Sequence, residues 1–368
     1  MLTATLKFCW ALRYLSKLFH GYLNFPLYWR KEMLPDVTVI GTCPTYTIGL
    51  SVDDYVSRIR RACADAERNG WKALLVYSDH AQIDPWVAAD CILKNSTSIS
   101  PLVAIQPLYM HPFSVAKLMC SLSLLYERAI HLNFISGGFP RDLETLCDAY
   151  NHDERYGRVI EYGKIISRLL SDGRPLTFRG KYYSVDGLQL PLANSLPSHC
   201  ASLFTISGSS AAGLEAAKQL GARAIQYLRP FEEYNGEILR KDLQYGTRIG
   251  IIARSSSEDA WAAATKLYPA NSIGEEVRRY FTRVSDSIWV KKLGKEISLP
   301  PGHPYWLGPY KTNQAACPFL VGKREDVARE LAGYMKLGLR TFLVEQVESE
   351  IDAEEIRIVF DLAAEQFT

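Results

Sequence analysis

The segment Ile206–Gly213 is the strongest candidate for ligand-binding chemistry in this sequence. It reads Ile-Ser-Gly-Ser-Ser-Ala-Ala-Gly and lies where an apolar run passes into a helical pattern. Backbone N–H groups at the beginning of a helix bind anions, and the hydroxyls of Ser209 and Ser210 add donors. A phosphate group therefore suits this segment, and a serine that only caps the helix explains the same pattern.

A second group lies at the beginning of a helix predicted over residues 153–170. His152 and Tyr156 are four residues apart, so on a helix they share one face and both can donate to one phosphate. Asn151 as the N-cap, with Glu154 three residues later, explains the same residues as a capping box. The cap and the ligand site are compatible, so both interpretations stay open.

A third group follows the apolar run Trp71–Tyr77. Asp79 and His80 form a carboxylate–imidazole pair that can perform general acid–base chemistry, and His80 is the candidate for proton transfer. We expect Asp84 to cap a helix instead. The eight cysteines contain no CxxC pair, which argues against a zinc site, so we expect no metal.

Eight apolar runs alternate with helical patterns and must position these groups. The runs lie at 37–40, 71–77, 102–105, 129–135, 203–206, 222–225, 247–252 and 341–344. Short runs without polar alternation are typical of parallel strands that are buried on both faces. The pattern favours an α/β fold whose parallel sheet is either doubly wound or closed as a (β/α)8 barrel.

Two long segments interrupt the alternation inside one domain over residues 36–368. The first, 171–200, contains a hairpin-like element at 182–185. The second, 269–316, is aromatic and carries Gly and Pro, which is typical of a lid or a binding loop. Residues 1–35 combine basic and aromatic side chains. They can form a membrane-surface helix, but we favour a plain N-terminal extension or a gene start placed before a true first residue at Met33.

The charge balance excludes some classes of protein. Lys and Arg number 42 against 40 Asp and Glu, which gives a net charge of +2. This balance argues against a nucleic-acid-binding protein or one that coats anionic membranes. No apolar stretch is long enough to span a membrane, and the singly spread cysteines fit a reducing compartment, so we expect a cytoplasmic protein.

Several segments together resemble the bacterial luciferase-like flavin monooxygenases, in the branch of the alkanesulfonate and nitrilotriacetate monooxygenases. The matching segments are Asp84–Trp86, Pro112 with its following helix, Asn133–Gly138, His152–Tyr156, Phe178–Tyr183, Ser207–Ser210 and Phe319–Gly322. The resemblance implies a (β/α)8 TIM barrel with insertions and a two-component system of peroxyflavin chemistry. Reduced FMN would come from a separate NAD(P)H-dependent flavin reductase, O2 would be the co-substrate, and a homodimer or homotetramer would be usual.

The resemblance also assigns cofactor contacts. The FMN phosphate would be held by Gly208, Ser209, Ser210, His152 and Tyr156. The flavin ring or the ribityl chain would lie beside Asn133, Ser136 and Gly137. The insertion 269–316 corresponds to the mobile loop of the family, which closes over the site and keeps water out.

Two departures from the alkanesulfonate enzymes bear on the substrate. Gln82 stands where those enzymes have a cysteine, and Asn313 stands where their mobile loop has an arginine. Without that guanidinium the best bidentate partner of a sulfonate is lost, which argues against a sulfonate substrate. Lys311, Arg229 and Arg223 remain as candidates to bind an anionic substrate, although we favour a place on a helix–strand surface for Arg223.

The mouth of the site should include the residues that follow the first strand. Cys43 either lines this mouth or is inert packing, and Tyr46 and Gln82 are candidates for contact with substrate or flavin. We therefore expect a monooxygenase that acts on a small organic molecule or on a carrier-bound biosynthetic intermediate. The alternatives are an F420-dependent hydride-transfer enzyme on the same fold and a non-catalytic flavin-binding subunit.

Overall fold

The computed structural model describes residues 37–138, 140–171, 173–234, 239–285, 287–293, 299–300, 302–347 and 349–367. These residues belong to the unit Asp36–Thr368. The extension predicted over residues 1–35 lies outside the described residues, so it stays a prediction. Within the described part, no helix combines the length and the apolar character that crossing a membrane requires.

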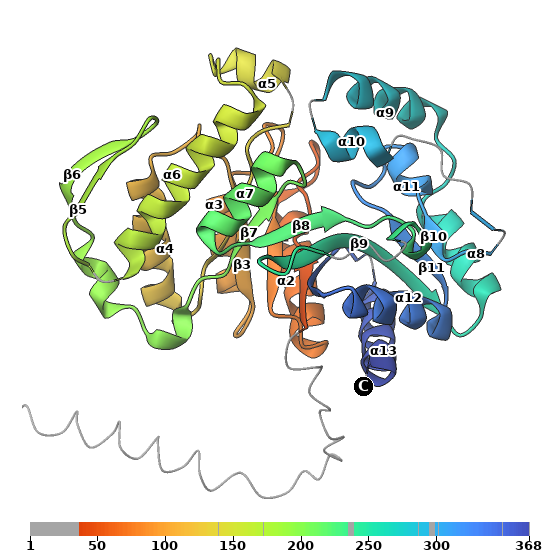
Figure 1. The fold of residues 1–368 in the computed structure, drawn as a ribbon. Coiled ribbons are helices and arrows are strands. Elements are labelled where there is room, and N and C mark those ends of the chain that lie inside the picture. Colours follow the sequence, from red (N-terminus) through yellow and green to blue (C-terminus); the bar gives the residue numbers. More distant parts are fainter. Residues whose placement is uncertain are drawn as a thin grey trace, which may run out of the picture. The chain divides into compact units, whose positions relative to one another are not determined.

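Eight parallel strands close into a barrel (Figure 1). They are β1 (Thr38–Thr42), β2 (Ala73–Val76), β3 (Ser100–Ile105), β4 (His131–Phe134), β7 (Phe204–Ser207), β8 (Arg223–Tyr227), β9 (Gln244–Arg254) and β12 (Leu339–Val344). Each strand pairs with the next, β9 pairs with β12, and β12 pairs with β1, so the ring closes. The predicted (β/α)8 barrel is confirmed, and each of the eight apolar runs overlaps one of these strands.

The strands form because their side chains are buried on both faces. Ile40, Leu75, Leu102, Ile225 and Leu343, from five different strands, pack into one cluster. Burial on both faces removes the polar alternation of a half-exposed sheet, which is why each strand appears as a short apolar run.

Helices surround the barrel and begin where polar side chains cap them. They are α2 (Val52–Arg68), α3 (Pro85–Lys94), α4 (Pro112–Tyr126), α5 (Pro140–Thr145), α6 (His152–Ser171), α7 (Ala211–Leu220), α8 (Ser257–Leu267), α12 (Arg324–Lys336) and α13 (Glu350–Phe367). Asp84 accepts the N–H of Trp86 at 2.9 Å and caps α3, as expected. Gly221, at φ +60°, ends α7 in the left-handed conformation that glycine favours.

The first insertion is a hairpin that lies beside α6, outside the barrel (Figure 1). Its strands are β5 (Leu176–Arg179) and β6 (Ser184–Leu188), and two 3-10 helices, η1 (Pro191–Ser195) and η2 (Ser198–Cys200), follow. The Glu161 carboxylate on α6 accepts the N–H groups of Lys181, Tyr182 and Tyr183 at 2.7, 2.8 and 3.0 Å. These N–H groups therefore form a turn, which is why the hairpin-like element expected at 182–185 begins its strand only at Ser184.

The second insertion contains regular structure that the sequence patterns did not reveal. Its elements are α9 (Ser272–Val284), α10 (Ile288–Leu293), β10 (Tyr305–Trp306) and α11 (Gly308–Lys311). A 3-10 helix, η3 (Phe231–Tyr234), lies earlier in the chain, between β8 and β9. Strand β11 (Phe319–Lys323) then pairs in parallel with the end of β9, and β10 pairs with β11. In Figure 1, α9 and α10 lie near α11, at the end of the molecule where α5 also lies. We call residues 269–316 the lid segment.

Candidate active site

A cavity of about 360 Å³ lies at the C-terminal ends of the barrel strands. The loops after β2, β3, β4 and β7 line it on one side, and the lid segment lines it on the other. This is where the active site of a (β/α)8 barrel is found, and the volume suits a small-molecule site. The cofactor-binding residues predicted from the sequence all line this cavity: Asn133, Ser136, Gly137, His152, Tyr156, Gly208, Ser209 and Ser210.

One end of the cavity has the chemistry of an anion site. Ser210 caps α7 by accepting the N–H of Gly213 at 3.1 Å, so the beginning of the helix faces this end. The hydroxyl oxygen of Ser209 is buried and has no hydrogen-bond partner among the described residues. A Cβ atom added at Gly208 would lie 2.0 Å from the Tyr156 hydroxyl, so glycine is what allows that hydroxyl to reach the loop. A buried hydroxyl without a partner is costly, and an anion would satisfy it.

His152 lies next to this anion site. Its ring packs edge-on against Tyr156, with the ring centroids 5.1 Å apart. Its Nδ1 lies 2.7 Å from a carboxylate oxygen of Asp153. The carboxylate favours a proton on Nδ1, which leaves Nε2 as the ring atom that can contact a ligand.

The loop after β4 is held from below by a buried arginine. The Arg155 guanidinium donates from Nε to the carbonyl of Ser136 at 3.1 Å and from Nη2 to that of Gly137 at 3.3 Å. A third bond runs from Nη1 to the carbonyl of Tyr150 at 3.0 Å. In β4 itself, the Asn133 side-chain oxygen accepts hydroxyls from β7, which leaves its amide N–H2 as the donor available to a ligand. The role of Arg155 was missed from the sequence, where it appeared only as part of a family motif.

His80 lines the cavity and is exposed. Its Nε2 lies 2.9 Å from the hydroxyl of Tyr109, which also lines the cavity and whose pKa is raised by burial. The pair places an imidazole and a phenol at the edge of the site, where a proton can pass between the cavity and water. Its role in catalysis stays a prediction.

Three residues expected near the mouth do not line the cavity. The side-chain oxygen of Gln82 accepts the backbone N–H of Tyr46 at 2.8 Å, so these two residues hold two loops together. Cys43 is buried and its backbone N–H continues the sheet to Leu75 at 2.8 Å. Burial raises the pKa of its thiol, which fits the inert packing that was one of its two interpretations.

The residues expected on the substrate and lid side of the site, Lys311, Asn313 and Arg229, also lie outside the cavity lining. Lys311 and Asn313 are exposed around the end of α11, and only their neighbours Tyr310 and Ala316 line the cavity. The guanidinium of Arg229 lies over the Tyr234 ring, 4.3 Å from its centroid, and outside the lining residues. The cationic groups of the cavity come from other positions.

The first of these is Arg248 on β9. Its Nη2 donates to the two Glu345 carboxylate oxygens at 3.0 and 2.7 Å and contacts the Tyr77 hydroxyl. The thiol of Cys317 lies 3.3 Å from the same carboxylate. The pKa of this thiol is raised, and burial is the main cause. An arginine within the apolar run 247–252 was the signal in the sequence, because a charged residue in a buried strand needs a polar site to face.

The second cationic group belongs to the lid segment. Arg278 on α9 lines the cavity together with Trp289 on α10. The lid segment is tied to the β4 loop because the Ser285 hydroxyl donates to the carbonyl of Gly138 at 2.9 Å. No pattern in the sequence indicated these contacts, since they join segments more than a hundred residues apart.

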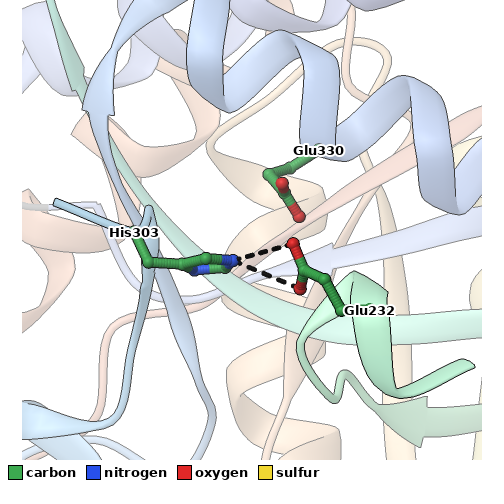
Figure 2. A group of neighbouring side chains, drawn as sticks. All are labelled: Glu232, His303 and Glu330. Carbon is green, nitrogen blue, oxygen red and sulfur yellow. Dashed lines mark hydrogen bonds and ion pairs between the residues drawn. The ribbon is translucent and has the colours of Figure 1, made fainter. Parts of the chain in front are cut away.

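A cluster of possible metal ligands lies outside the cavity. Figure 2 shows the His303 ring directed toward the Glu232 carboxylate, with Glu330 close by. His303 Nδ1 accepts the N–H of Tyr305 at 3.0 Å, so the neutral ring carries its proton on Nε2 and donates it to Glu232 at 3.2 Å. A metal would need the lone pair of that same Nε2. The cluster is therefore a hydrogen bond between η3 and the lid segment, with the Glu330 carboxylate of α12 close by.

Comparison with known proteins identifies relatives of the chain. Residues 40–341 match the sequence profile of a family described as luciferase-like monooxygenases. The chain is 32% identical over 289 residues to the 4-(gamma-L-glutamylamino)butanoyl-[BtrI acyl-carrier protein] monooxygenase BtrO of Niallia circulans. That match covers 76% of this chain and 83% of the relative.

Solved structures share the fold at low sequence identity. The EDTA monooxygenase EmoA from Chelativorans sp. BNC1 is 15% identical with a TM-score of 0.65, over 90% of this chain and 95% of that one. An F420-dependent secondary alcohol dehydrogenase is 14% identical with a TM-score of 0.58, over 89% of this chain and 99% of that one. Another neighbour, the oxygenating constituent of 3,6-diketocamphane monooxygenase from Pseudomonas putida, is described in complex with FMN. The fold alone therefore does not identify the cofactor.

Proposed function

The chain belongs to the luciferase-like monooxygenase family, as the sequence resemblance predicted, and from this premise we propose that it is a reduced-FMN-dependent monooxygenase. Reduced FMN would be supplied by a separate NAD(P)H-dependent flavin reductase, and O2 would be the co-substrate. The substrate would be a small organic molecule or an acyl group on a carrier. The reductase, the homodimer or homotetramer and the cytoplasmic location stay predictions.

The observation that carries this proposal is the buried, unpartnered hydroxyl of Ser209 at the beginning of α7. Together with the hydroxyl of Tyr156 beside Gly208, it provides donors for the phosphate of FMN. The hydroxyl of Ser210 and the His152 ring border the same position. The residues present therefore fit the phosphate of a flavin mononucleotide.

The protein's own residues would bind and orient the flavin and would keep water away from it. Asn133 would donate to the flavin from its amide, while Arg155 would keep Ser136 and Gly137 in place beside it. When bound, reduced FMN supplies the electrons with which O2 is activated. The lid segment would exclude water from this chemistry, which is why its tie to Gly138 matters.

A carrier-bound substrate is supported by the relative from Niallia circulans, whose name describes an acyl-carrier-protein-bound substrate. At 32% identity over most of both chains, a related substrate class is the proposal that this similarity favours. The main alternative, hydride transfer with F420, has support from the fold of the secondary alcohol dehydrogenase. The two cofactors differ in their reaction with O2, and this difference permits a direct test.

The test is an anaerobic titration of the purified protein with reduced FMN, reduced riboflavin and reduced F420, followed by mixing with oxygenated buffer. We expect reduced FMN to bind more tightly than reduced riboflavin, because only FMN carries the phosphate. Ser209→Ala and Tyr156→Phe should each lower this preference by about 1–3 kcal/mol, since each removes a buried donor. Ser256→Ala, which removes the cap of α8 far from the cavity, is the matched control.

Two results would overturn the proposal. Preferential binding of reduced F420, with no consumption of O2, would assign hydride transfer. Binding of none of the three would assign a non-catalytic subunit. An unchanged FMN preference in both variants would remove the phosphate site from Ser209 and Tyr156.

A further inference from the structure

Arg278 is a guanidinium that lines the cavity without an acidic partner. Its Nε donates to the carbonyl of Tyr310 at 2.8 Å and its Nη2 to that of Ala315 at 3.0 Å. Its central carbon lies 4.2 Å from the centroid of the Tyr310 ring. All these partners are neutral, and no carboxylate pairs with Arg278 in the part of the chain that the structure describes. Burial lowers its pKa, so its charge is held at a cost that an anion would offset.

Trp289 adds an unused donor from the same lid segment. Its side chain is only 6% exposed, and its indole N–H is buried without a partner among the described residues. The ring packs edge-on against Tyr227, with the centroids 6.1 Å apart. An indole N–H can only donate, so it can be satisfied only by an acceptor that enters the cavity.

The other charged residues that line the cavity do not form ion pairs with Arg278 among the described residues. Arg248 is already neutralised by Glu345 at 2.7 Å. Asp79 and Asp142 also line the cavity, and neither forms an ion pair with Arg278. Asp79 accepts the N–H of Ala81 at 2.8 Å within its own loop. Among the described residues, the lid side of the cavity therefore offers a positive charge without an acidic partner and an indole N–H without an acceptor.

We propose that Arg278 and Trp289 form a site on the lid segment for a carboxylate carried by the substrate. The proposal rests on the proposed function, because it places the anionic end of the substrate opposite the flavin. A planar guanidinium fixed by two backbone carbonyls and an aromatic ring is preorganised for a planar carboxylate.

An anion at Arg278 could come from the substrate or from the phosphate of the flavin, and the experiment separates the two. Isothermal titration calorimetry of the full-length protein without flavin would use glutarate and its uncharged analogue glutaramide. We expect glutarate to bind at least about tenfold more tightly than glutaramide, because only glutarate carries the charge.

Variants of Arg278 and Trp289 test whether these two side chains bind the carboxylate. Arg278→Gln should abolish the preference for glutarate, and Arg278→Lys should keep part of it. Arg279→Gln is the matched control, because its side chain is the next along α9 and is 74% exposed. Trp289→Phe should weaken glutarate binding about three- to tenfold through the loss of one buried donor. Circular dichroism and melting curves show that each variant is folded.

Three outcomes would overturn the inference. Equal binding of glutarate and glutaramide by the wild type would show that the cavity does not select a carboxylate. An undiminished preference in Arg278→Gln would remove the site from Arg278. A fall in the FMN-to-riboflavin affinity ratio in Arg278→Gln, like that expected for Ser209→Ala, would assign Arg278 to the flavin phosphate. Failure of the wild type to bind reduced FMN would instead contradict the proposed function and leave the glutarate comparison intact.

Discussion

Arg155 shows how one buried side chain supports a whole face of the site. It is 4% exposed, and it donates to the backbone carbonyls of Ser136, Gly137 and Tyr150. These carbonyls belong to the loop after β4 and to the segment before α6. A neutral side chain could not satisfy all of them, so the loop depends on the shape of a guanidinium.

We predict that Arg155→Gln lowers the free energy of unfolding by about 2–4 kcal/mol, because it leaves buried carbonyls without donors. It should also weaken the binding of FMN and riboflavin to the same extent, since the loop and not the phosphate site is disturbed. Urea unfolding and flavin titration measure the two effects. Arg168→Gln, an exposed arginine on the same helix, should change neither. A selective loss of FMN binding would contradict this positioning role.

The lid segment is the element that joins the two sides of the cavity. Ser285 follows α9 directly, is 2% exposed, and its hydroxyl donates to the carbonyl of Gly138. Its backbone N–H caps α9 at Phe281, and its hydroxyl also accepts the N–H of Ser287 at 3.1 Å, just before α10. This hydrogen bond therefore joins the lid segment to the β4 loop across the cavity.

Removing this bond should loosen the lid segment while the barrel stays intact. For Ser285→Ala we expect a loss of about 1 kcal/mol in local stability, which corresponds to roughly a fivefold rise in the open population. Hydrogen exchange of residues 272–293 measures the opening, and the yield of hydrogen peroxide from reduced FMN and O2 should rise with it. Ser272→Ala, at the exposed beginning of α9, is the control. Exchange equal to that of the wild type would exclude the proposed tie.

At the scale of the whole molecule, the cluster of Glu232, His303 and Glu330 connects three distant parts of the chain. Glu330 Oε2 is buried without a partner in the described part of the chain. Burial raises the pKa of Glu330, the Glu232 carboxylate raises it further, and His303 and Arg329 oppose the shift. The folded state therefore holds the proton of Glu330 more firmly than the unfolded state does.

This shift determines the sign of a pH dependence. A carboxyl group whose pKa is raised on folding contributes stability below its ordinary pKa, and the contribution is lost as the pH rises through the raised pKa. We predict that Glu330→Gln is more stable than the wild type at neutral pH by a few tenths to about 1 kcal/mol, and equal to it at about pH 4. Denaturant unfolding at both pH values tests this, with the exposed Glu276→Gln as control.

The same cluster yields a prediction about metals. Because His303 Nδ1 already accepts the N–H of Tyr305, added Zn²⁺ or Mn²⁺ should not raise the melting temperature. A chelator should not lower it either. A rise that disappears in Glu330→Gln would show that the cluster binds a cation after all.

The sequence by itself determined the parallel strands and the cap of α7, and its resemblance to a known family chose the closed barrel over a doubly wound sheet. Strands buried on both faces must be short apolar runs, and a helix that begins at Ser210 needs its cap, so both leave a local pattern. The family motifs likewise placed His152, Tyr156 and Asn133 at one cavity. These features depend on the spacing of residues within short segments, and that spacing can be seen directly in the sequence.

The tertiary structure alone decided which charged side chains line the cavity. Sequence reasoning chose Arg229, Lys311 and Asn313, whereas the cavity is lined by Arg248 and Arg278. A charged side chain on an amphipathic helix such as α9 looks like a solvated residue until the lid segment folds back over the barrel. Which charges lose contact with water depends on packing between segments far apart in the chain, and no local pattern records that packing.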